Sequence, residues 1–311
     1  MKAAVAFLTD KDGYRLVRYA ITSLLMKTSA RLDVYLFCRD FRPNGCDPIF
    51  RFAESARNPV ALAEINSSEF ANFKNYNRIT NTAMLKLDLT YRLLEKYDRV
   101  LYADNDVLFF TDVSPLLRIR MDGHALAAVP DVAEQLGFTG GGIVERSRER
   151  GRTGAYFNAG LLLFDCQKLA SHDYRIPYLE TALRHETEGD CDYKQQCGTP
   201  DQCSLNVIFD NDWKQIDLRW NAQSCLKHTS VWRDAYIRHY NGWHKAVPLR
   251  PWRNDKKDTA LINAMSAAWG ERHALRWPAT SAIYELDRHL RGRNEHVRFL
   301  EQAIKQMQPL I

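Results

Sequence analysis

The sequence contains no long hydrophobic run, no internal repeat and no low-complexity tract. No apolar stretch approaches the ~20 residues that a membrane-spanning helix needs. The first apolar run, Ala3–Leu8, ends at Thr9 and Asp10, so we expect no signal peptide and a cytoplasmic location. The 311 residues are 45% hydrophobic and 26% charged. These ordinary values exclude intrinsic disorder, collagen and a coiled coil as descriptions of the whole chain.

The chain also lacks a strong charge imbalance and any Cys-x-x-Cys pair. Its 43 Lys and Arg against 38 Asp and Glu give a net charge of +5, too weak to indicate a nucleic-acid partner. The seven cysteines, an odd number, favour free thiols in a reducing compartment. Cys191, Cys197 and Cys203 recur at equal intervals. Structural zinc sites favour tighter pairs, so the spacing argues against zinc there.

Short apolar runs alternate with helical patterns from the start of the chain. Lys2–Leu8 and Asp33–Cys38 are predicted strands, and Tyr14–Lys27 between them carries apolar residues at helical spacing. Such a strand–helix–strand unit implies a parallel pair of strands. A helix is predicted over Thr82–Lys96, and further strands over Val60–Ile65, Arg99–Ala103, Ala125–Val129, Leu161–Phe164, Trp213–Asp217 and Ala235–His239. The alternation predicts an α/β fold with helices on both faces of a sheet.

Two segments depart from this alternation. Gly137–Gly154 is rich in Gly, Arg and Glu, and it is predicted to be a loop over a site or a solvated surface loop. Ser281–Met307 has apolar residues at helical spacing among many charges. It is predicted to form an amphipathic helix or helix pair that packs on the domain or contacts a membrane surface. We expect a domain over residues 1–255 and a helical extension over residues 256–311.

Two carboxylates, Asp104 and Asp106, follow the predicted strand Arg99–Ala103. Residues two apart on an extended chain point to the same side, and ligands of open α/β sheets bind at the carboxyl ends of strands. Converging carboxylates repel one another unless a cation lies between them, and a hard divalent cation is the natural occupant. Alone, such a pair is explained equally well by a solvated turn.

Two further motifs place small or polar residues where a ligand could approach. Asn158 and Gly160 stand at the start of a predicted strand, and a plain turn would also explain them. Asp201 and Gln202 follow Pro200 at a predicted helix start, which local structure alone would also explain.

His239 ends a predicted strand, and Gly242 and Lys245 follow it. A lone His at a strand end is most often structural. Beside Asp104 and Asp106, however, it completes a set of two carboxylates and one imidazole that suits a divalent ion such as manganese. Lys245 can reach a phosphate as a point charge.

Together these motifs resemble glycosyltransferase family 8, the retaining sugar-nucleotide transferases that include glycogenin and bacterial lipopolysaccharide glucosyl- and galactosyltransferases. The landmarks stand in the family's order over residues 1 to 255: Thr9-Asp10, Tyr-x-Asp-x-Asp at 102–106, Phe-Asn-Ala-Gly at 157–160, Asp201-Gln202, and His-x-x-Gly-x-x-Lys at 239–245. The resemblance implies a GT-A fold, which is a single Rossmann-like domain with a mostly parallel sheet. It also implies Mn²⁺ or Mg²⁺ as cofactor and a UDP-sugar as donor.

The resemblance further implies a role for each matching residue. The metal ligands would be Asp104, Asp106 and His239. The diphosphate would be held by Gly242 and Lys245. The uracil and ribose would meet Leu8, Thr9, Asp10, Tyr14 and the backbone of Asn105. The donor sugar would lie near Lys86, Asp131, Asn158, Ala159, Gly160, Asp201 and Gln202. Lys86 stands where the family usually has an Arg.

Two departures from the family pattern stand out. Cys203 follows Asp201-Gln202 where the family often has a further Asp, which affects the expected donor-sugar contacts. Lys245 is separated from Pro251-Trp252 by a longer stretch than usual, which suggests a longer loop over the diphosphate.

The implied reaction moves glucose or galactose from UDP to a glycan or glycolipid acceptor, such as lipopolysaccharide, with retention at the anomeric carbon. Retention needs a covalent intermediate or attack on the face from which the leaving group departs. Gln202 is a poor nucleophile. We therefore favour front-face attack, with the departing β-phosphate taking the acceptor's proton, over a nucleophilic Asp131 or Asp201.

Two other functions remain open at this level. A metal-dependent nucleotidyltransferase would also use paired carboxylates, although it has no need of His239 or of the Asn-Ala-Gly motif. A non-catalytic nucleotide-sugar-binding protein on the same fold, or a basic surface-binding protein that acts through its C-terminal segment, would belong to another class.

Overall fold

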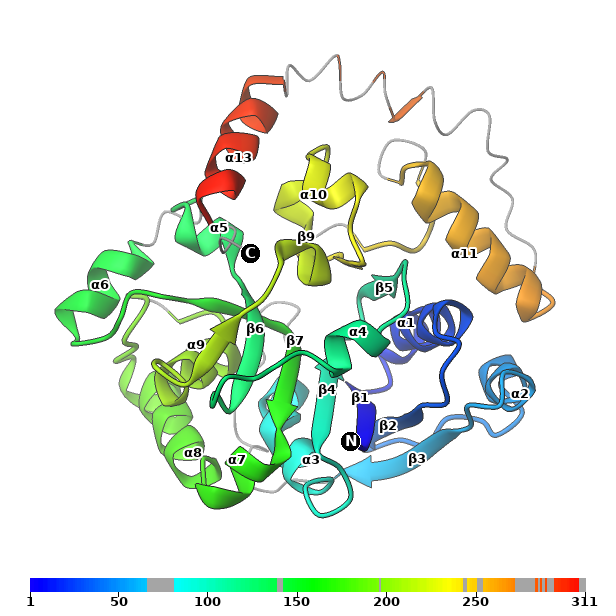
Figure 1. Cartoon of the computed structure of the whole chain (residues 1–311), viewed down its shortest axis with the longest axis horizontal. Coiled ribbons are helices and arrows are strands. Elements are labelled where there is room, and N and C mark those ends of the chain that lie inside the picture. The colour runs from blue at the N-terminus through cyan, green and yellow to red at the C-terminus, as the bar shows by residue number, and fades with distance from the viewer. Residues whose placement is uncertain are drawn as a thin grey trace.

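A seven-stranded sheet lies at the centre of the computed structural model (Figure 1). The structure describes residues 1–65, 81–138, 142–195, 197–242, 245–250, 254–271 and 294–307, together with 283, 284, 286 and 289. Along the sheet the strand order is β3-β2-β1-β4-β7-β6-β8. The strands are β1 (Ala3–Thr9), β2 (Asp33–Arg39), β3 (Val60–Ile65), β4 (Arg99–Ala103), β6 (Leu126–Pro130), β7 (Phe157–Asp165) and β8 (Trp213–Gln215).

One strand of this sheet runs against the others. β3, β2, β1 and β4 are parallel neighbours, and so are β6 and β8, whereas β7 is antiparallel to both β4 and β6. The first residues of β7 therefore lie at the same edge of the sheet as the last residues of β1, β4 and β6. The predicted mostly parallel α/β sheet is confirmed, and the reversed strand is a feature that the sequence pattern did not reveal.

A second, three-stranded sheet stands beside that edge. It consists of β5 (Val107–Phe109), β9 (Ala222–Gln223) and β10 (Ile237–His239) in the order β5-β10-β9. β10 is antiparallel to β5, with His239 opposite Val107. The backbone N–H of Tyr240 donates to the carbonyl of Asp106 over 2.9 Å. This small sheet brings His239 beside the end of β4.

Helices cover both faces of the large sheet. They are α1 (Tyr14–Lys27), α2 (Pro48–Ser55), α3 (Lys86–Tyr91), α4 (Ser114–Leu117), α5 (Val132–Gln135), α6 (Ile143–Glu149), α7 (Cys166–Ser171), α8 (Arg175–Leu183), α9 (Pro200–Ile208), α10 (Ser230–Arg233), α11 (Lys256–Ala268) and α13 (Asn294–Met307). Shorter turns are η1 (Asn81–Leu85), η2 (Arg184–Glu188), η3 (Leu218–Asn221) and η4 (Ser224–Leu226). The helix predicted over Thr82–Lys96 is thus a 3₁₀ turn followed by the shorter α3.

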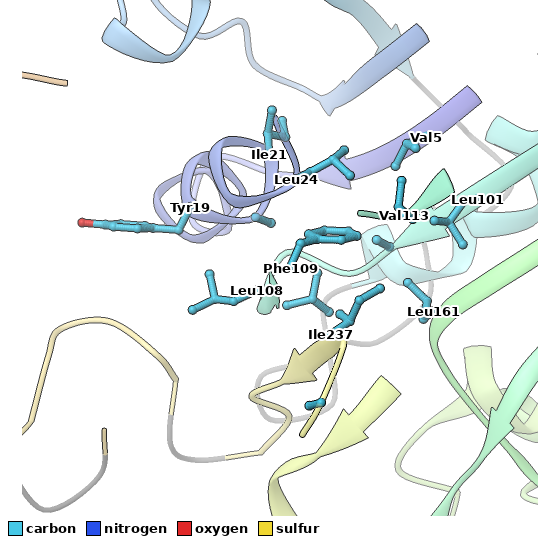
Figure 2. Packing of buried hydrophobic residues seen from close by; sticks show 14 of the residues in the cluster. Val5, Tyr19, Ile21, Leu24, Leu101, Leu108, Phe109, Val113, Leu161 and Ile237 are labelled. Carbon is cyan, nitrogen blue, oxygen red and sulfur yellow. The ribbon is translucent and has the colours of Figure 1, made fainter. Parts of the chain in front are cut away.

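The alternation of side chains along β1 divides the core into two clusters. Val5 and Phe7 point into the first, together with residues of α1, α11, α13 and the small sheet. Ala4 and Ala6 point into the second, against η1, α3, α8 and α9. Phe109 of β5 lies between α1 and Ile237 of β10 (Figure 2), and its ring meets Phe7 edge to face at 6.4 Å. Burial of these side chains anchors the small sheet to the large one.

The C-terminal helices share the first core cluster. Leu300 and Ile304 of α13 and Ile262 of α11 are buried in it. Glu301 accepts a hydrogen bond from the hydroxyl of Ser230 over 2.7 Å. Much of the segment between the two helices, which includes part of the predicted helix over 281–307, lies outside the described residues. Within the described part of the chain, no helix has the length and apolar character that a membrane span requires.

The Gly-rich segment 137–154 is only partly a loop. It contains the helix α6, which Gly142 precedes in the left-handed conformation with φ +48°. Residues 139–141 lie outside the described part. Its predicted role as a loop over the site stays a prediction.

Candidate functional site

A cavity of about 690 Å³ lies at the edge of the sheet where β4 and β6 end and β7 begins. Of the residues that the sequence motifs single out, its lining includes Leu8, Asp10, Lys86, Asp104, Asn105, Asp106, Asp131, Asn158, Gly160, Asp201, Gln202, His239 and Lys245. Thr9, Tyr14, Ala159 and Gly242 do not belong to this lining. Residues far apart in the sequence thus converge on one space.

Asp104, Asp106 and His239 form a group whose ligand atoms all lie within 4.8 Å of one another. The Nε2 atom of His239 lies 3.2 Å from Asp106 Oδ1 and 3.9 Å from Asp104 Oδ2. Two carboxylates and one imidazole at these separations fit a divalent ion such as manganese. All three residues line the cavity, so an ion held by them would lie beside a substrate bound there.

The ring of His239 is held in one orientation by Asn221 of η3. Nδ1 of His239 lies 3.0 Å from Asn221 Oδ1. Because an amide oxygen only accepts, Nδ1 donates to it, and Nε2 is the ring nitrogen that faces the two carboxylates. The amide nitrogen of Asn221 in turn donates to Asn158 Oδ1 over 2.9 Å. Asn221 is completely buried and was missed by sequence reasoning, because nothing local marks it as part of a site.

Gly160 lies directly beneath the His239 ring. A Cβ atom at this position would stand 2.1 Å from His239 Cε1, far inside van der Waals contact. The carbonyl of Gly160 also accepts a hydrogen bond from the backbone N–H of Asp104 over 2.9 Å. The glycine is therefore required by close approach of the imidazole, and it ties β7 to the carboxylate pair.

Lys86, at the start of α3, is buried among carboxylates. Its Nζ atom lies 2.9 Å from Asp201 Oδ2 and 3.2 Å from Asp104 Oδ1, and it donates to the carbonyl of Ala159 over 3.2 Å. Burial by itself would lower the pKa of Lys86, but the two carboxylates raise it above its usual range. Lys86 thus stays charged and links Asp104 to Asp201 of α9.

Asp106 is the more buried of the two carboxylates that follow β4, and it faces two bases. Burial by itself would raise the pKa of Asp106, but His239 and Lys245 hold it well below its usual range. Lys245 forms an ion pair with the second carboxylate oxygen of Asp106. A lysine at the rim of the cavity therefore stands next to the candidate metal site, as a phosphate-binding residue would.

Asp131 is the N-cap of α5, and its carboxylate is fully engaged. It accepts from the backbone N–H of Glu134 over 3.1 Å, from Asn158 Nδ2 over 2.9 Å and from Gln202 Nε2 over 3.0 Å. Gln202 Oε1 accepts from the N–H of Ala159 over 3.0 Å. Both ends of the Gln202 amide are thereby fixed, and Asp131 positions Asn158 and Gln202.

The opposite end of the cavity is built from the turn after β1. Asp10 Oδ1 accepts from the N–H of Gly13 over 2.8 Å, and Asp10 Oδ2 accepts from the hydroxyl of Thr82 over 3.2 Å. The side chain of Asn105 donates to the hydroxyl of Thr9 over 3.2 Å. Thr82 was also missed from the sequence, because its partner Asp10 lies far away along the chain. This network holds the wall that Leu8 and Asp10 present to the cavity.

Tyr14 and Gly242 lie beyond the lining. The Tyr14 ring meets Phe41 edge to face at 5.6 Å, and burial together with Asp47 raises the pKa of Tyr14. Gly242 has φ +85°, a conformation that glycine adopts without strain. Residues 243–244 and 251–253, which include Pro251-Trp252, lie outside the described residues.

Comparison with known proteins places the chain among sugar transferases. A family model described as glycosyl transferase family 8 matches residues 4–256. The chain is 25% identical over 280 residues to lipopolysaccharide 1,2-glucosyltransferase of Escherichia coli (strain K12), covering 81% of this chain and 79% of that protein. Over 190 residues it is 25% identical to glycosyltransferase GlyF of Streptococcus pneumoniae serotype 4 (strain ATCC BAA-334 / TIGR4), covering 61% of this chain and 42% of that protein.

General stress protein A of Bacillus subtilis (strain 168) is 25% identical over 171 residues, which cover 54% of each chain. The chain therefore spans only about half the length of GlyF and of general stress protein A.

Solved structures share the fold. The galactosyltransferase LgtC in complex with donor and acceptor sugar analogs superposes with a TM-score of 0.63 at 20% identity, covering 88% of this chain and 97% of that one. The glycosyltransferase GlyE of Streptococcus pneumoniae TIGR4 gives a TM-score of 0.59 at 20% identity, covering 86% of this chain and 63% of that one. The GT-A architecture predicted from the motifs is confirmed by these likenesses.

Proposed function

The chain belongs to glycosyl transferase family 8, and on that basis we propose that it transfers a hexose from a UDP-sugar to a glycan hydroxyl with retention at the anomeric carbon. The observation that carries the proposal is the convergence of Asp104, Asp106 and His239 in a cavity that Gln202 and Asn158 also line. Relatives named as lipopolysaccharide glucosyltransferases support glucose as the sugar, with galactose as the alternative.

The metal ligands in this proposal are Asp104, Asp106 and His239, and the ion is Mn²⁺ or Mg²⁺. Such an ion, when bound, supplies Lewis-acid stabilisation of the leaving diphosphate. Lys245 adds a positive charge for the diphosphate, and the backbone at Gly242 leaves room for its oxygens. Asn221 keeps Nε2 of His239 available to the metal, which is a supporting role outside the ligand set.

The donor lies along the cavity in this proposal. Its uracil and ribose face Leu8, Asp10 and the backbone of Asn105, with Thr9 and Tyr14 supporting that wall. Its sugar faces Asn158, Gly160, Asp201 and Gln202, with Lys86, Asp131 and Ala159 behind them. The hydrogen bonds from Asn158 and Gln202 to Asp131 support this assignment, because they fix both amides before a sugar arrives.

The reaction proceeds by front-face attack in this proposal. The bond between the anomeric carbon and the β-phosphate oxygen breaks, the acceptor oxygen bonds to that carbon on the same face, and the acceptor proton passes to the departing phosphate. Asp131 accepts three hydrogen bonds and Asp201 pairs with Lys86. Asp131 is thus the more heavily hydrogen-bonded carboxylate, whereas Oδ1 of Asp201 is buried without a hydrogen-bond partner among the described residues. The engagement of Asp131 supports front-face attack over a covalent intermediate on that residue.

The acceptor is a glycan or glycolipid of the lipopolysaccharide type, and the enzyme works in the cytoplasm at the inner face of a membrane. The C-terminal region presents Leu286 and Phe299 to solvent, with 55% and 49% of each side chain exposed, and this supports a peripheral contact. Co-sedimentation with anionic vesicles tests it, with the pair Leu286→Ser and Phe299→Ser as the variant. Equal recovery of wild type and variant would contradict the membrane contact and leave the transferase proposal intact.

The first experiment measures UDP release from a panel of UDP-sugars with manganese, in wild type and in Asp104→Ala. Slow hydrolysis of the correct donor should appear without an acceptor, and Asp104→Ala should abolish it. Asp88→Ala is the matched control, because that carboxylate pairs only with the surface residue Arg92 among the contacts described. Release of pyrophosphate would indicate a nucleotidyltransferase, and manganese-independent UDP binding without turnover would indicate a binding protein.

A further inference from the structure

A second group of metal-ligating side chains lies outside the cavity. The ligand atoms of His185, Cys191 and Cys197 lie within 4.8 Å of one another. His185 belongs to η2, and the two cysteines belong to the irregular segment between η2 and α9. His185 is 2% exposed and Cys191 is completely buried. Buried thiols and an imidazole at this separation are the ligand types of structural zinc sites.

One nitrogen of His185 makes no hydrogen bond within the described part of the chain although it is buried. Nδ1 lies 3.5 Å from the hydroxyl of Ser204, whereas Nε2 faces Asp192 Oδ2 at 3.9 Å, beyond hydrogen-bond distance. An unsatisfied buried nitrogen is costly, and it calls for an explanation. With Nδ1 turned to the hydroxyl, Nε2 is the nitrogen available to a metal, as in other sites where a second contact orients the ligating histidine.

Cys203 of α9 supplies a third sulfur. It is completely buried in the cluster that also holds Cys191, and Cys197 packs against that cluster. The hydroxyl of Tyr156 lies 3.1 Å from Cys203 Sγ, where it could donate to a thiolate. Cys203 therefore lies beside the group of His185, Cys191 and Cys197, and one imidazole and three sulfurs gather in one part of the fold.

We propose that these four residues bind one structural zinc ion. Tetrahedral zinc with Zn–S bonds of about 2.3 Å places its ligand atoms about 4 Å apart. The ligand atoms of His185, Cys191 and Cys197, which lie within 4.8 Å of one another, therefore need only small movements, and Cys203 would turn toward them from α9. Binding releases the three thiol protons and leaves one net negative charge on the site. Two cations of the same segment, Lys194 and Arg184, stand near this charge, and each also pairs with a carboxylate, Glu134 and Asp192 respectively.

The zinc ion would fasten the irregular segment 189–199 to the beginning of α9. Cys203 directly follows Gln202, which hydrogen-bonds to Asp131 and Ala159 in the cavity wall. The sulfur site thus supports the helix that carries Asp201 and Gln202 without lining the cavity itself. It also accounts for Cys203, the residue at which the chain departs from the family pattern.

The experiment is elemental analysis of the full chain, purified without a metal-binding tag and dialysed against metal-free buffer. About one zinc per chain should remain with wild type, and Cys191→Ser and Cys197→Ser should fall to background. Cys46→Ser and Cys225→Ser are the matched controls, because both cysteines lie outside the group, and they should retain the zinc. Cobalt-exchanged wild type should show the visible absorption of a tetrahedral thiolate complex.

The wild-type protein alone decides the question if the serine variants fail to fold. Wild type without zinc, with a disulfide between Cys191 and Cys197 or with free thiols, would overturn the proposal. Iron in place of zinc would overturn it as well. Zinc content is independent of the transferase assay, so zinc in a protein that releases no UDP would refute the proposed reaction and leave the zinc site standing.

Discussion

Two groups of potential metal ligands in this molecule contrast in chemistry and in construction. Asp104, Asp106 and His239, the oxygen group, present oxygen and imidazole to a cavity, and they come from two segments far apart in the sequence, the end of β4 and the end of β10. The group of His185, Cys191 and Cys197, with Cys203 beside it, is the sulfur group. It presents mainly sulfur, lines no part of that cavity and lies within one short stretch. An open oxygen site suits a substrate-bridging ion, whereas a closed sulfur site suits a permanent one.

The two groups also differ in how they are held. The oxygen group depends on three neighbours among others. Gly160 sets the position of the His239 ring and Asn221 sets its tautomer. Lys86 sets the charge beside Asp104. The sulfur group is held by the chain segment that contains it. Variants of the supporting residues should therefore disable the oxygen group while leaving the sulfur group loaded with zinc.

Gly160→Ala should have the largest effect. The added methyl would stand 2.1 Å from His239 Cε1, so the ring moves and the metal loses a ligand. We expect kcat/KM for the donor to fall about 10³-fold, which corresponds to about 4 kcal/mol. Gly45→Ala is the control, because a Cβ there meets nothing within 4 Å. Unchanged manganese affinity in Gly160→Ala, measured by calorimetry, would contradict the role of His239.

Lys86→Met should mainly affect stability. The substitution leaves Asp201 buried and Asp104 half-buried, without the cation that lies between them. Removing one partner of a buried ion pair costs about 3 kcal/mol or more, so the free energy of unfolding should fall by that amount. Denaturant titration measures it, with Lys256→Met on the exposed start of α11 as control. A loss below 1 kcal/mol would mean that the two carboxylates are not stabilised by Lys86.

Asn221→Ala should weaken metal binding by the oxygen group without abolishing it. The His239 ring loses the acceptor that fixes its tautomer, and such supporting contacts are worth about 10- to 100-fold in metal affinity. Manganese titration should show this loss, and zinc content should stay at the wild-type value. Asn221→Asp keeps an acceptor for Nδ1 but loses the donor to Asn158 Oδ1, so it should recover only part of the affinity. If alanine and aspartate weaken binding equally, the hydrogen bond to Nδ1 is not what matters.

The smallest expected effect is on how the free energy of unfolding depends on pH, through an ion pair between the small sheet and α11. Arg238 of β10 pairs with Asp255, the N-cap of α11, at 2.8 Å. Burial by itself would raise the pKa of Asp255, but Arg238 lowers it. A carboxyl whose folded pKa is lowered contributes stability above its unfolded pKa, and this contribution is lost as pH falls through the folded value.

The free energy of unfolding should therefore decline below about pH 4, and less steeply in Asp255→Asn. Asparagine is an equally good N-cap, so this variant removes the charge and keeps the cap. Parallel curves for wild type and variant, measured by denaturant unfolding at several pH values, would show that Asp255 does not contribute to acid sensitivity.

The sequence predicts the large sheet well, because its strands are short apolar runs between turn residues. Val60–Ile65 and Arg99–Ala103 match the structure in both bounds, and the helix Tyr14–Lys27 does as well. The small sheet escaped prediction in part, since Val107–Phe109 and Ala222–Gln223 are too short to show a periodicity. Its strands depend on packing of residues such as Phe109 instead of on local pattern.

The candidate site, like the fold, contains residues that the sequence reveals and residues that it does not. Asp104, Asp106 and His239 could be selected because ionisable residues at strand ends carry a local signal. Asn221 and Thr82 carry none, since their importance comes from one side-chain contact across the fold. The sulfur group was dismissed from its spacing, because the histidine that joins it stands six residues before Cys191 on another element, and only the folded chain shows them together.

The scattered origin of the oxygen group has a consequence for synthesis on the ribosome. At about 5–20 residues per second, His239 emerges roughly ten seconds after Asp104 and Asp106. A nascent chain therefore exposes two carboxylates without the imidazole, and it holds no complete site with which to capture an ion prematurely. The sulfur residues, by contrast, emerge together within a second or a few. Loading would follow the order of translation, with the permanent ion first and the exchangeable one last.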